Sequence, residues 1–333
     1  MDYQQLLLAL LPDLLVVVAL FAALGVDYSR MRGSRLAERF QVACQISAAG
    51  LIAGLAVILV QLTQASSFKA LASITDGQLV LDTSTLTLKA LLYAMGLGVL
   101  PLAKRDQITP QVSEYFALLL LATLGMGFVV TSRNLLGAFV ALELVSLSLY
   151  AMTVLNQAKR ASAEAALKYL TFGAVSSGFL LFGLSYLYGA TGQLDLTQMD
   201  MQRSPMLVLA YLLIFVGLGF KLALAPFHLW APDVYQNAPT PVAGWIGSGS
   251  KIAAAALLIV LLKPVSSTLK DALVPALAAL AVLSMVVGNL GALRQTNLKR
   301  LLAYSAIANA GYLLVGVVAF SAEGNTSVIF YVL

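Results

Sequence analysis

The chain has 333 residues, of which 60% are hydrophobic and only 11% are charged, and its mean hydropathy is +0.90. Soluble domains carry about 25% charged residues, so the composition excludes a soluble enzyme and predicts an all-α polytopic membrane protein. The net charge of +5 comes from basic residues scattered singly between apolar runs, which indicates membrane topology and no nucleic-acid partner.

Apolar runs of roughly 20 residues, the length that spans a bilayer as a helix, recur along the chain. An eleventh run begins near residue 326 and stops at Leu333. Half a span would leave backbone groups unpaired in lipid, so we expect either a truncated gene product or a piece of a longer chain. The N-terminus has no basic region and no cleavage site typical of a signal peptide. The ten complete runs lie near residues 5–26, 40–62, 78–102, 114–131, 134–155, 164–187, 206–231, 240–262, 272–292 and 300–320.

The loop charges predict an orientation. Odd-numbered loops hold more Lys and Arg than even-numbered loops, so the positive-inside rule puts the odd loops in the cytoplasm and the N-terminus outside. The eleven basic residues of the odd loops are Arg30, Arg32, Arg35, Arg39, Lys104, Arg105, Lys159, Arg160, Arg294, Lys299 and Arg300, against Lys69, Arg133, Arg203, Lys263 and Lys270 in the even loops.

Two spans open in the same way, which suggests an internal repeat. Asn134-Leu135 begins one span and Asn297-Leu298 begins another, and a tyrosine follows each asparagine by 16 or 15 residues. The hairpins that carry these pairs are separated by an odd number of spans, so the repeats would be inverted in the membrane.

Several ionisable residues lie inside the apolar spans instead of in the loops. Each would cost about 2.5–3.5 kcal/mol at the bilayer centre if it were unpaired. For Lys89 and Glu164, near the ends of their spans, we expect a structural ion pair or a side chain that reaches the membrane surface. The residues expected to transfer protons are Glu143, Lys168, Lys221 and Lys251, one in each of four successive spans.

Lysine suits proton transfer because burial lowers its pKa while a neighbouring carboxylate raises it again. A buried lysine near Glu143 would stay protonated, and weakening that pair would release the proton. Arginine could not replace lysine in this role, since it does not deprotonate in proteins.

The stretch GFKLALAPFHLWAPDVYQNAPTPV, residues 219–242, predicts a helix break beside one of these lysines. Pro226 donates no backbone hydrogen bond, so the carbonyl of Leu222 would be freed next to Lys221. His228 lies two turns further on, and Asp233 continues the polar path. We expect His228 to relay protons, against the alternative of a packing residue.

Other chemistry is not supported by the sequence. GWIGSGSK, residues 244–251, reverses the serine and lysine order of a phosphate-binding loop and lies in an apolar span with no strand before it. The single cysteine, Cys44, excludes an internal disulfide and a four-thiolate iron–sulfur site, and one histidine excludes bis-histidine haem ligation. We therefore expect no metal and no cofactor bound by this chain alone.

The segments KLALAPFHLWAPDVYQNAPTPV and QTNLKRLLAYSAIANAGYLLVG resemble the two signatures of the proton-conducting membrane subunits of respiratory complex I, a family that includes multi-subunit cation/proton antiporters. Lys251 in GSGSKIAAAA is most similar to the N-type subunits of bacterial NADH:quinone oxidoreductase, since L and M types tend to carry histidine there. Asn309 stands where histidine or glutamine is common in the family.

The resemblance implies fourteen helices with two inverted five-helix repeats and two broken helices, the second of them beyond Leu333. It maps proton-transfer roles onto Glu143, Lys168, Lys221 in the broken seventh helix, and Lys251. The implied regions are an N-terminal part at 1–113, a first repeat at 114–262 and an incomplete second repeat at 272–333.

The resemblance also implies a proton-translocating subunit in the bacterial inner membrane, among the other membrane subunits of complex I and lipid. NAD, FMN, iron–sulfur clusters and quinone would be held by partner subunits. A cation/proton antiporter subunit on the same fold and a non-transporting membrane scaffold remain alternatives.

Overall fold

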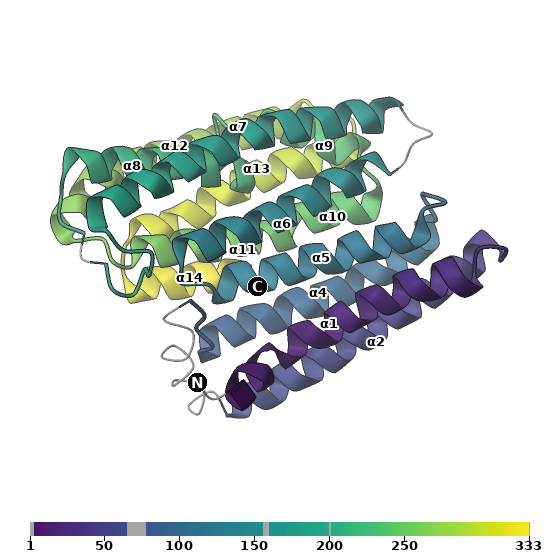
Figure 1. The fold of residues 1–333 in the computed structure, drawn as a ribbon. Helices are drawn as coiled ribbons and strands as arrows, with labels where there is room; N and C mark the ends of the chain where they lie inside the picture. Colours follow the sequence, from purple (N-terminus) through teal and green to yellow (C-terminus); the bar gives the residue numbers. More distant parts are fainter. Residues whose placement is uncertain (1–2, 65–77, 156–159, 200, 333) are drawn as a thin grey trace. The chain divides into compact units, whose positions relative to one another are not determined.

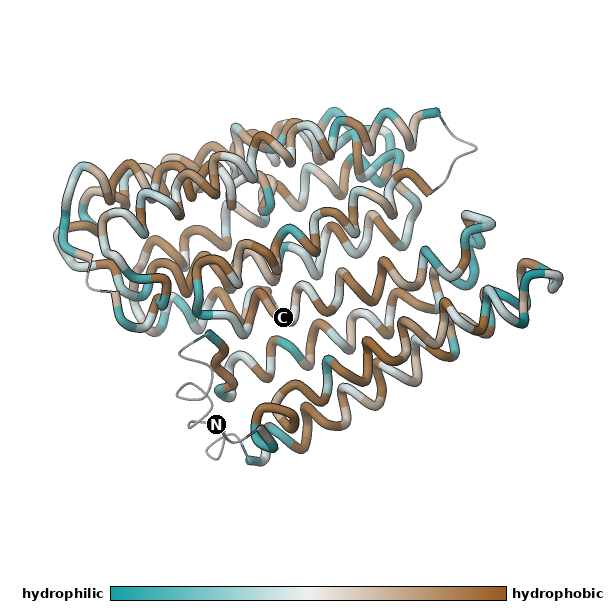
Figure 2. Tube along the Cα trace, in the orientation of Figure 1, coloured by the Kyte–Doolittle hydropathy of each residue, from teal (hydrophilic) through white to brown (hydrophobic). Residues whose placement is uncertain are grey.

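The computed structural model describes residues 3–64, 78–155, 160–199 and 201–332. In these ranges the chain is almost entirely helical, and ten helices are long and apolar enough to cross a membrane. Figure 2 shows hydrophobic residues along most of the length of the long helices and hydrophilic residues gathered at their ends. The ten predicted spans each correspond to one of these helices, so the fold class is confirmed. Lys69 and Lys159, which entered the loop count, lie outside the described residues.

The chain divides into two compact units, which we describe separately. The first comprises residues 1–163 and 238–249. Its long helices pack in the order α1 on α2, α2 on α4, and α5 on α4 and α6, while the short α10 contacts α4 and α6 (Figure 1). The helices are α1 (Tyr3–Arg30), α2 (Leu36–Thr63), α4 (Thr83–Asp106), α5 (Val112–Thr131), α6 (Leu135–Val154) and α10 (Thr240–Gly247).

The second unit comprises residues 164–237 and 250–333. Its closest pair is α12 and α13, and α13 also contacts α9 and α14. The helices are α7 (Arg160–Thr191), which enters the unit at Glu164, α8 (Pro205–Leu222), α9 (Ala231–Asn237), α11 (Gly249–Leu262), α12 (Ser267–Leu293), α13 (Leu298–Val318) and α14 (Ala322–Val332).

The two Asn-Leu pairs open helices for the same local reason. The side chain of Asn134 accepts hydrogen bonds from the backbone of Leu136 and Gly137 at the start of α6, and that of Asn297 accepts one from Arg300 at the start of α13. Asparagine is among the preferred N-cap residues because its side chain satisfies amides that the helix leaves unpaired. The shared cap accounts for the asparagine that precedes each of the two helices. The inverted repeats and the regions 1–113, 114–262 and 272–333 stay predictions.

Two spans differ from the continuous helices that their hydropathy predicts. The run 206–231 is helical only to Leu222 and becomes helical again at Ala231. The span 240–262 is interrupted at Ser248, where φ is −116° and ψ is −80°, three residues before Lys251. Hydropathy measures only how apolar a run is, so an apolar run continues across both helix interruptions without a sign of them.

Candidate functional site

The break in the seventh span lies beside Lys221, in the second unit. Helix α8 ends at Leu222, and Ala223 turns into the left-handed region with φ 60° and ψ 39°. Leu222 is four residues before Pro226, the position whose carbonyl would clash with the proline ring if the helix continued. The amides of Ala223 and Leu224 donate to carbonyls at residues 219 and 220, which closes the last turn.

Neighbouring elements satisfy and pack the segment that follows the break. The amide of Ala225 donates to Ser284 Oγ on α12 at 2.9 Å, and Ser284 is fully buried. Trp230 stacks on Tyr169 of α7, with ring centroids 4.5 Å apart, and lies 5.0 Å from the ring of Phe220. Non-helical backbone at membrane depth is tolerated where protein satisfies it, and this segment meets that condition at Ala225.

Lys221 lies in the last turn of α8, where the partial negative charge of the helix C-terminus favours a cation. Its ammonium nitrogen is 5.9 Å from the centroid of the Phe220 ring. The side chain is half-buried. The lysine therefore lies directly at the interruption of its helix, as the sequence predicted, and its role in proton transfer stays a prediction.

Lys168 forms ion pairs with two carboxylates. Its Nζ is 2.8 Å from Glu164, one turn earlier on α7, and 2.9 Å from Asp233 on α9. The Glu164 side chain is 67% exposed, whereas that of Asp233 is 29% exposed. An ion pair was one of the two arrangements expected for Glu164, and it is present; its structural role stays a prediction. The same ammonium is shared with a carboxylate that lies just beyond the helix break.

Asp233 also binds a second cation. Its other carboxylate oxygen accepts a hydrogen bond from Arg300 Nη1 at 2.7 Å, and the same nitrogen donates to Gln236 at 3.3 Å. Asp233 thus connects α7, α9 and α13. Sequence reasoning counted Arg300 among the cytoplasmic loop residues and missed this contact. The signal that could have found it is the N-cap Asn297, which places Arg300 inside the first turn of α13.

Lys251 has a different kind of partner. Its Nζ donates to the backbone carbonyl of Ala306 on α13 at 2.8 Å. A carbonyl dipole accepts a hydrogen bond from either the ammonium or the neutral amine, so this contact does not require the amine to stay charged. Unlike Lys168, Lys251 forms no ion pair with any residue that the structure describes.

His228 lies in the segment between α8 and α9. Its carbonyl accepts from the amide of Ala231 at 2.9 Å, while its Nδ1 is buried without a hydrogen-bond partner in the described part of the chain. The hydroxyl of Tyr235 on α9 is likewise buried without a hydrogen-bond partner among the described residues. Buried polar atoms without partners are uncommon in native structures, and these two lie on either side of Asp233 in the chain.

Glu143 lies in α6 of the first unit and is half-buried. Its expected pairing with a lysine of the second unit stays a prediction. Lys89 in the same unit is bound by Asp13 of α1 at 2.6 Å, and Tyr93 donates to that carboxylate at 2.9 Å. The Lys89 and Asp13 side chains are 2% and 4% exposed. The structural pair predicted for Lys89 is confirmed, and Asp13, which sequence reasoning did not single out, is its partner.

Comparisons with known proteins identify the family of this chain. The family model described as "NADH:quinone oxidoreductase/Mrp antiporter, TM" matches residues 132–333. NADH-quinone oxidoreductase subunit N 2 of Acidobacterium capsulatum is 44% identical, over 99% of this chain and 70% of that protein. Subunit N of Alkalilimnicola ehrlichii is 41% identical, over 77% of this chain and 54% of its own length.

Solved structures share the fold. A chain of respiratory complex I from Thermus thermophilus aligns with a TM-score of 0.78 and 34% identity, over 96% of this chain and 67% of that chain. A chain of the Mrp complex from a Dietzia species aligns with a TM-score of 0.76 at 21% identity, a likeness of fold alone. This chain belongs to the antiporter-like family of membrane subunits, and within it to the subunit N branch of NADH-quinone oxidoreductase.

Proposed function

We propose that this chain is a proton-translocating membrane subunit of an NADH:quinone oxidoreductase, in which quinone reduction elsewhere in the complex drives proton movement. Lys251 carries the proposal. It is an amine in a membrane span whose described partner is a backbone carbonyl of another span, 2.8 Å away. A lysine held in this way keeps a hydrogen-bond partner whether or not it carries the proton.

The other lysines extend the proposed route within the second unit. Lys221 lies at the interrupted end of α8, and Lys168 is held by Asp233 just beyond the interruption. A change in the position of α9 would alter the distance between Asp233 and Lys168, and with it the free energy of the protonated amine. Glu143 would supply a carboxylate from the first unit, and His228 a relay at the break.

The proposal also names the partners of the subunit and its orientation in the membrane. The partners are the other membrane subunits of the complex, lipid, and quinone through the complex, while NAD, FMN and iron–sulfur clusters belong to those partners. In the described residues no group of three His, Cys, Asp or Glu is placed to hold a metal. The excess of basic residues in odd-numbered loops supports an N-terminus outside the bacterial inner membrane.

The family also contains antiporter subunits, so a cation/proton antiporter is the second candidate. The relatives that are 44% and 41% identical are named as NADH-quinone oxidoreductase subunits, which favours the first. NADH oxidation coupled to proton uptake in inverted membrane vesicles supports the first candidate. Sodium-dependent proton exchange without NADH supports the second.

Lys251→Arg tests the role of the amine directly. Arginine keeps the positive charge but does not release a proton, so proton pumping should fall strongly while the complex still assembles. Pumping is measured by dye quenching in vesicles, normalised to the amount of complex. Lys270→Arg is the control, because Lys270 lies in the first turn of α12 and its ammonium nitrogen is 5.4 Å from the centroid of the Phe320 ring. Normal pumping by Lys251→Arg would make Lys251 a fixed charge.

A further inference from the structure

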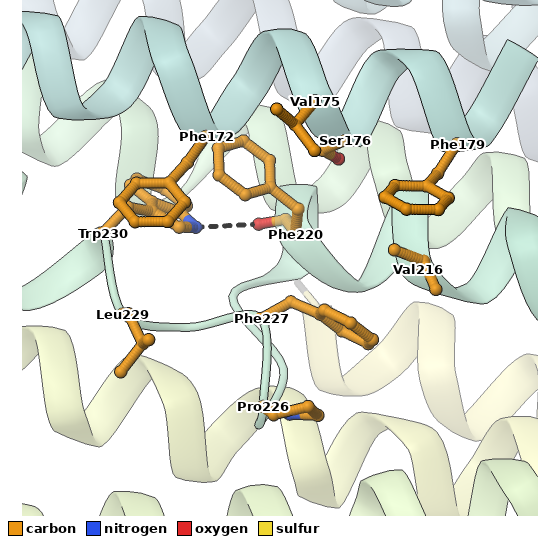
Figure 3. A pocket seen from close by; sticks show the side chains of 10 residues that line it. All are labelled: Phe172, Val175, Ser176, Phe179, Val216, Phe220, Pro226, Phe227, Leu229 and Trp230. Carbon is orange, nitrogen blue, oxygen red and sulfur yellow. Dashed lines mark hydrogen bonds between the residues drawn. The ribbon is translucent and has the colours of Figure 1, made fainter.

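A pocket of about 310 Å³ lies beside the helix break, entirely within the second unit. One wall comes from α7, and the other comes from α8 and the segment that follows it (Figure 3). The pocket is lined by Phe172, Val175, Ser176, Phe179, Val216, Phe220, Pro226, Phe227, Leu229 and Trp230.

The side chains that line the pocket present almost only hydrocarbon to a ligand. Its two polar side chains are both engaged with α8: Ser176 Oγ donates to the carbonyl of Gly217 at 3.0 Å, and Trp230 Nε1 donates to that of Phe220 at 3.2 Å. Every other lining side chain is a hydrocarbon. A ligand with a buried polar group would lose its hydrogen bonds to water and find no free donor among these side chains.

The mouth of the pocket opens on the surface of a membrane span. Val175 of α7 is 62% exposed and Leu229 of the segment after α8 is 65% exposed, although both line the pocket. Helix α7 is one of the ten apolar helices. Because lipid hydrocarbon surrounds such spans in a bilayer, the molecules most abundant at this mouth are acyl chains.

The size of the pocket restricts what enters it. Ligand pockets in proteins measure about 300–1,000 Å³, so this one is at the small end. A helix with its side chains is about 10–12 Å in diameter, so even two turns of a partner helix would need more than twice this volume. A single flexible hydrocarbon chain is narrow enough to fit.

We propose that this pocket binds one acyl chain of a membrane phospholipid. A phospholipid leaves its headgroup outside the pocket, whereas a quinone ring requires donors for its carbonyl oxygens that the lining side chains do not provide. The seated chain contacts the hydrocarbon side chains of Pro226, Phe227 and Leu229 in the segment between α8 and α9. This site depends on the membrane location and not on proton transfer.

The test uses the assembled complex in phospholipid vesicles that contain a phospholipid with a diazirine at the end of one acyl chain. After irradiation, mass spectrometry locates the adducts. We expect adducts on Phe172, Val175 or Leu229 at several times the level on Phe182, which is on α7, 65% exposed and outside the pocket. Excess unlabelled phospholipid should reduce the pocket adducts, and excess long-chain quinone should not.

Val175→Trp should fill the pocket and reduce the adducts on Phe172 and Leu229 several-fold, while Phe182→Trp on the same helix should leave them unchanged. If Val175→Trp lowers the amount of assembled complex, Val175→Phe is used in its place. The proposal is wrong if the pocket residues are labelled no more than Phe182, if filling has no effect, or if quinone competes. Labelling at Phe182 with none in the pocket would also overturn it, because a neighbouring subunit would then cover the mouth.

Discussion

At the scale of single residues, Asp233 is the charge on which most of the described site depends. It accepts hydrogen bonds from Lys168 at 2.9 Å and from Arg300 at 2.7 Å, and it lies in the first turn of α9, the helix that follows the break. A carboxylate between two cations stays ionised because each cation favours its charged form. Asp233 therefore acts as a positioning residue that holds α9 against α7 and α13.

Asp233→Asn should lower proton pumping and loosen α9, because it leaves two cations with a weaker acceptor. A double-mutant cycle of Asp233→Asn with Arg300→Gln should give a coupling of about 0.5–1 kcal/mol in thermal stability, the range expected for a partly exposed pair. Glu164→Gln is the matched control, since its side chain is 67% exposed and Lys168 keeps Asp233. Pumping that survives Asp233→Asn and fails in Glu164→Gln would contradict this assignment.

The sequence identified lysines at this scale but not their partners. Lys168 and Asp233 are 65 residues apart, Arg300 and Asp233 are 67 apart, and Lys89 and Asp13 are 76 apart. Hydropathy shows that a charge lies in an apolar span, and the cost of burying it shows that it needs a partner. Which partner it finds depends on the faces that distant helices turn toward each other, and a single sequence contains no such information.

At the scale of elements, the buried Lys89–Asp13 pair joins α4 to α1. Lys89→Met leaves the Asp13 carboxylate without its cation and should destabilise the protein by about 3–5 kcal/mol, whereas adding Asp13→Leu should restore most of that loss. The readout is the amount of assembled complex and its thermal stability. Pumping per assembled complex should stay normal in the double variant. A double variant that assembles but does not pump would make this pair part of the proton path.

Close contact between α12 and α13 depends on Gly288. A Cβ added there would lie 2.5 Å from the backbone nitrogen of Ala308 and 2.8 Å from its Cα, so the helices would have to separate. Gly288→Ala should therefore cost about 1–3 kcal/mol, as overpacking does. Gly178→Ala on α7 is the control, because nothing lies within 4 Å of its added Cβ. Equal thermal stability of the two variants would contradict the packing argument.

The positions of helices were the most predictable feature at this scale. A run of about 20 apolar residues has no other stable structure in lipid, so the ten spans followed from composition. The ends of helices were less predictable. Proline chemistry indicated the break at Leu222, beside Lys221, and α8 ends there, whereas Ser248 interrupts its span without any proline at that position.

At the scale of the whole molecule, the lysines of the spans differ in the groups that hold them. Lys89 has a buried carboxylate, Lys168 has two partly exposed carboxylates, and Lys251 has a backbone carbonyl. Removing either partner of a buried ion pair leaves an uncompensated charge, whereas a carbonyl accepts a hydrogen bond from the ammonium or from the neutral amine. We therefore expect a structural role for Lys89 and a proton-carrying role for Lys251, with Lys168 controlled through Asp233.

The central claim is that protons pass through the lysines around the broken helix. The most direct measurement is the number of protons translocated per NADH oxidised in inverted membrane vesicles that contain Lys221→Ala, normalised to assembled complex. We expect this ratio or the coupled rate to fall strongly, while NADH oxidation by an artificial electron acceptor stays normal because no redox centre is altered. A normal ratio at the normal coupled rate would contradict the account and leave the chain as a membrane scaffold.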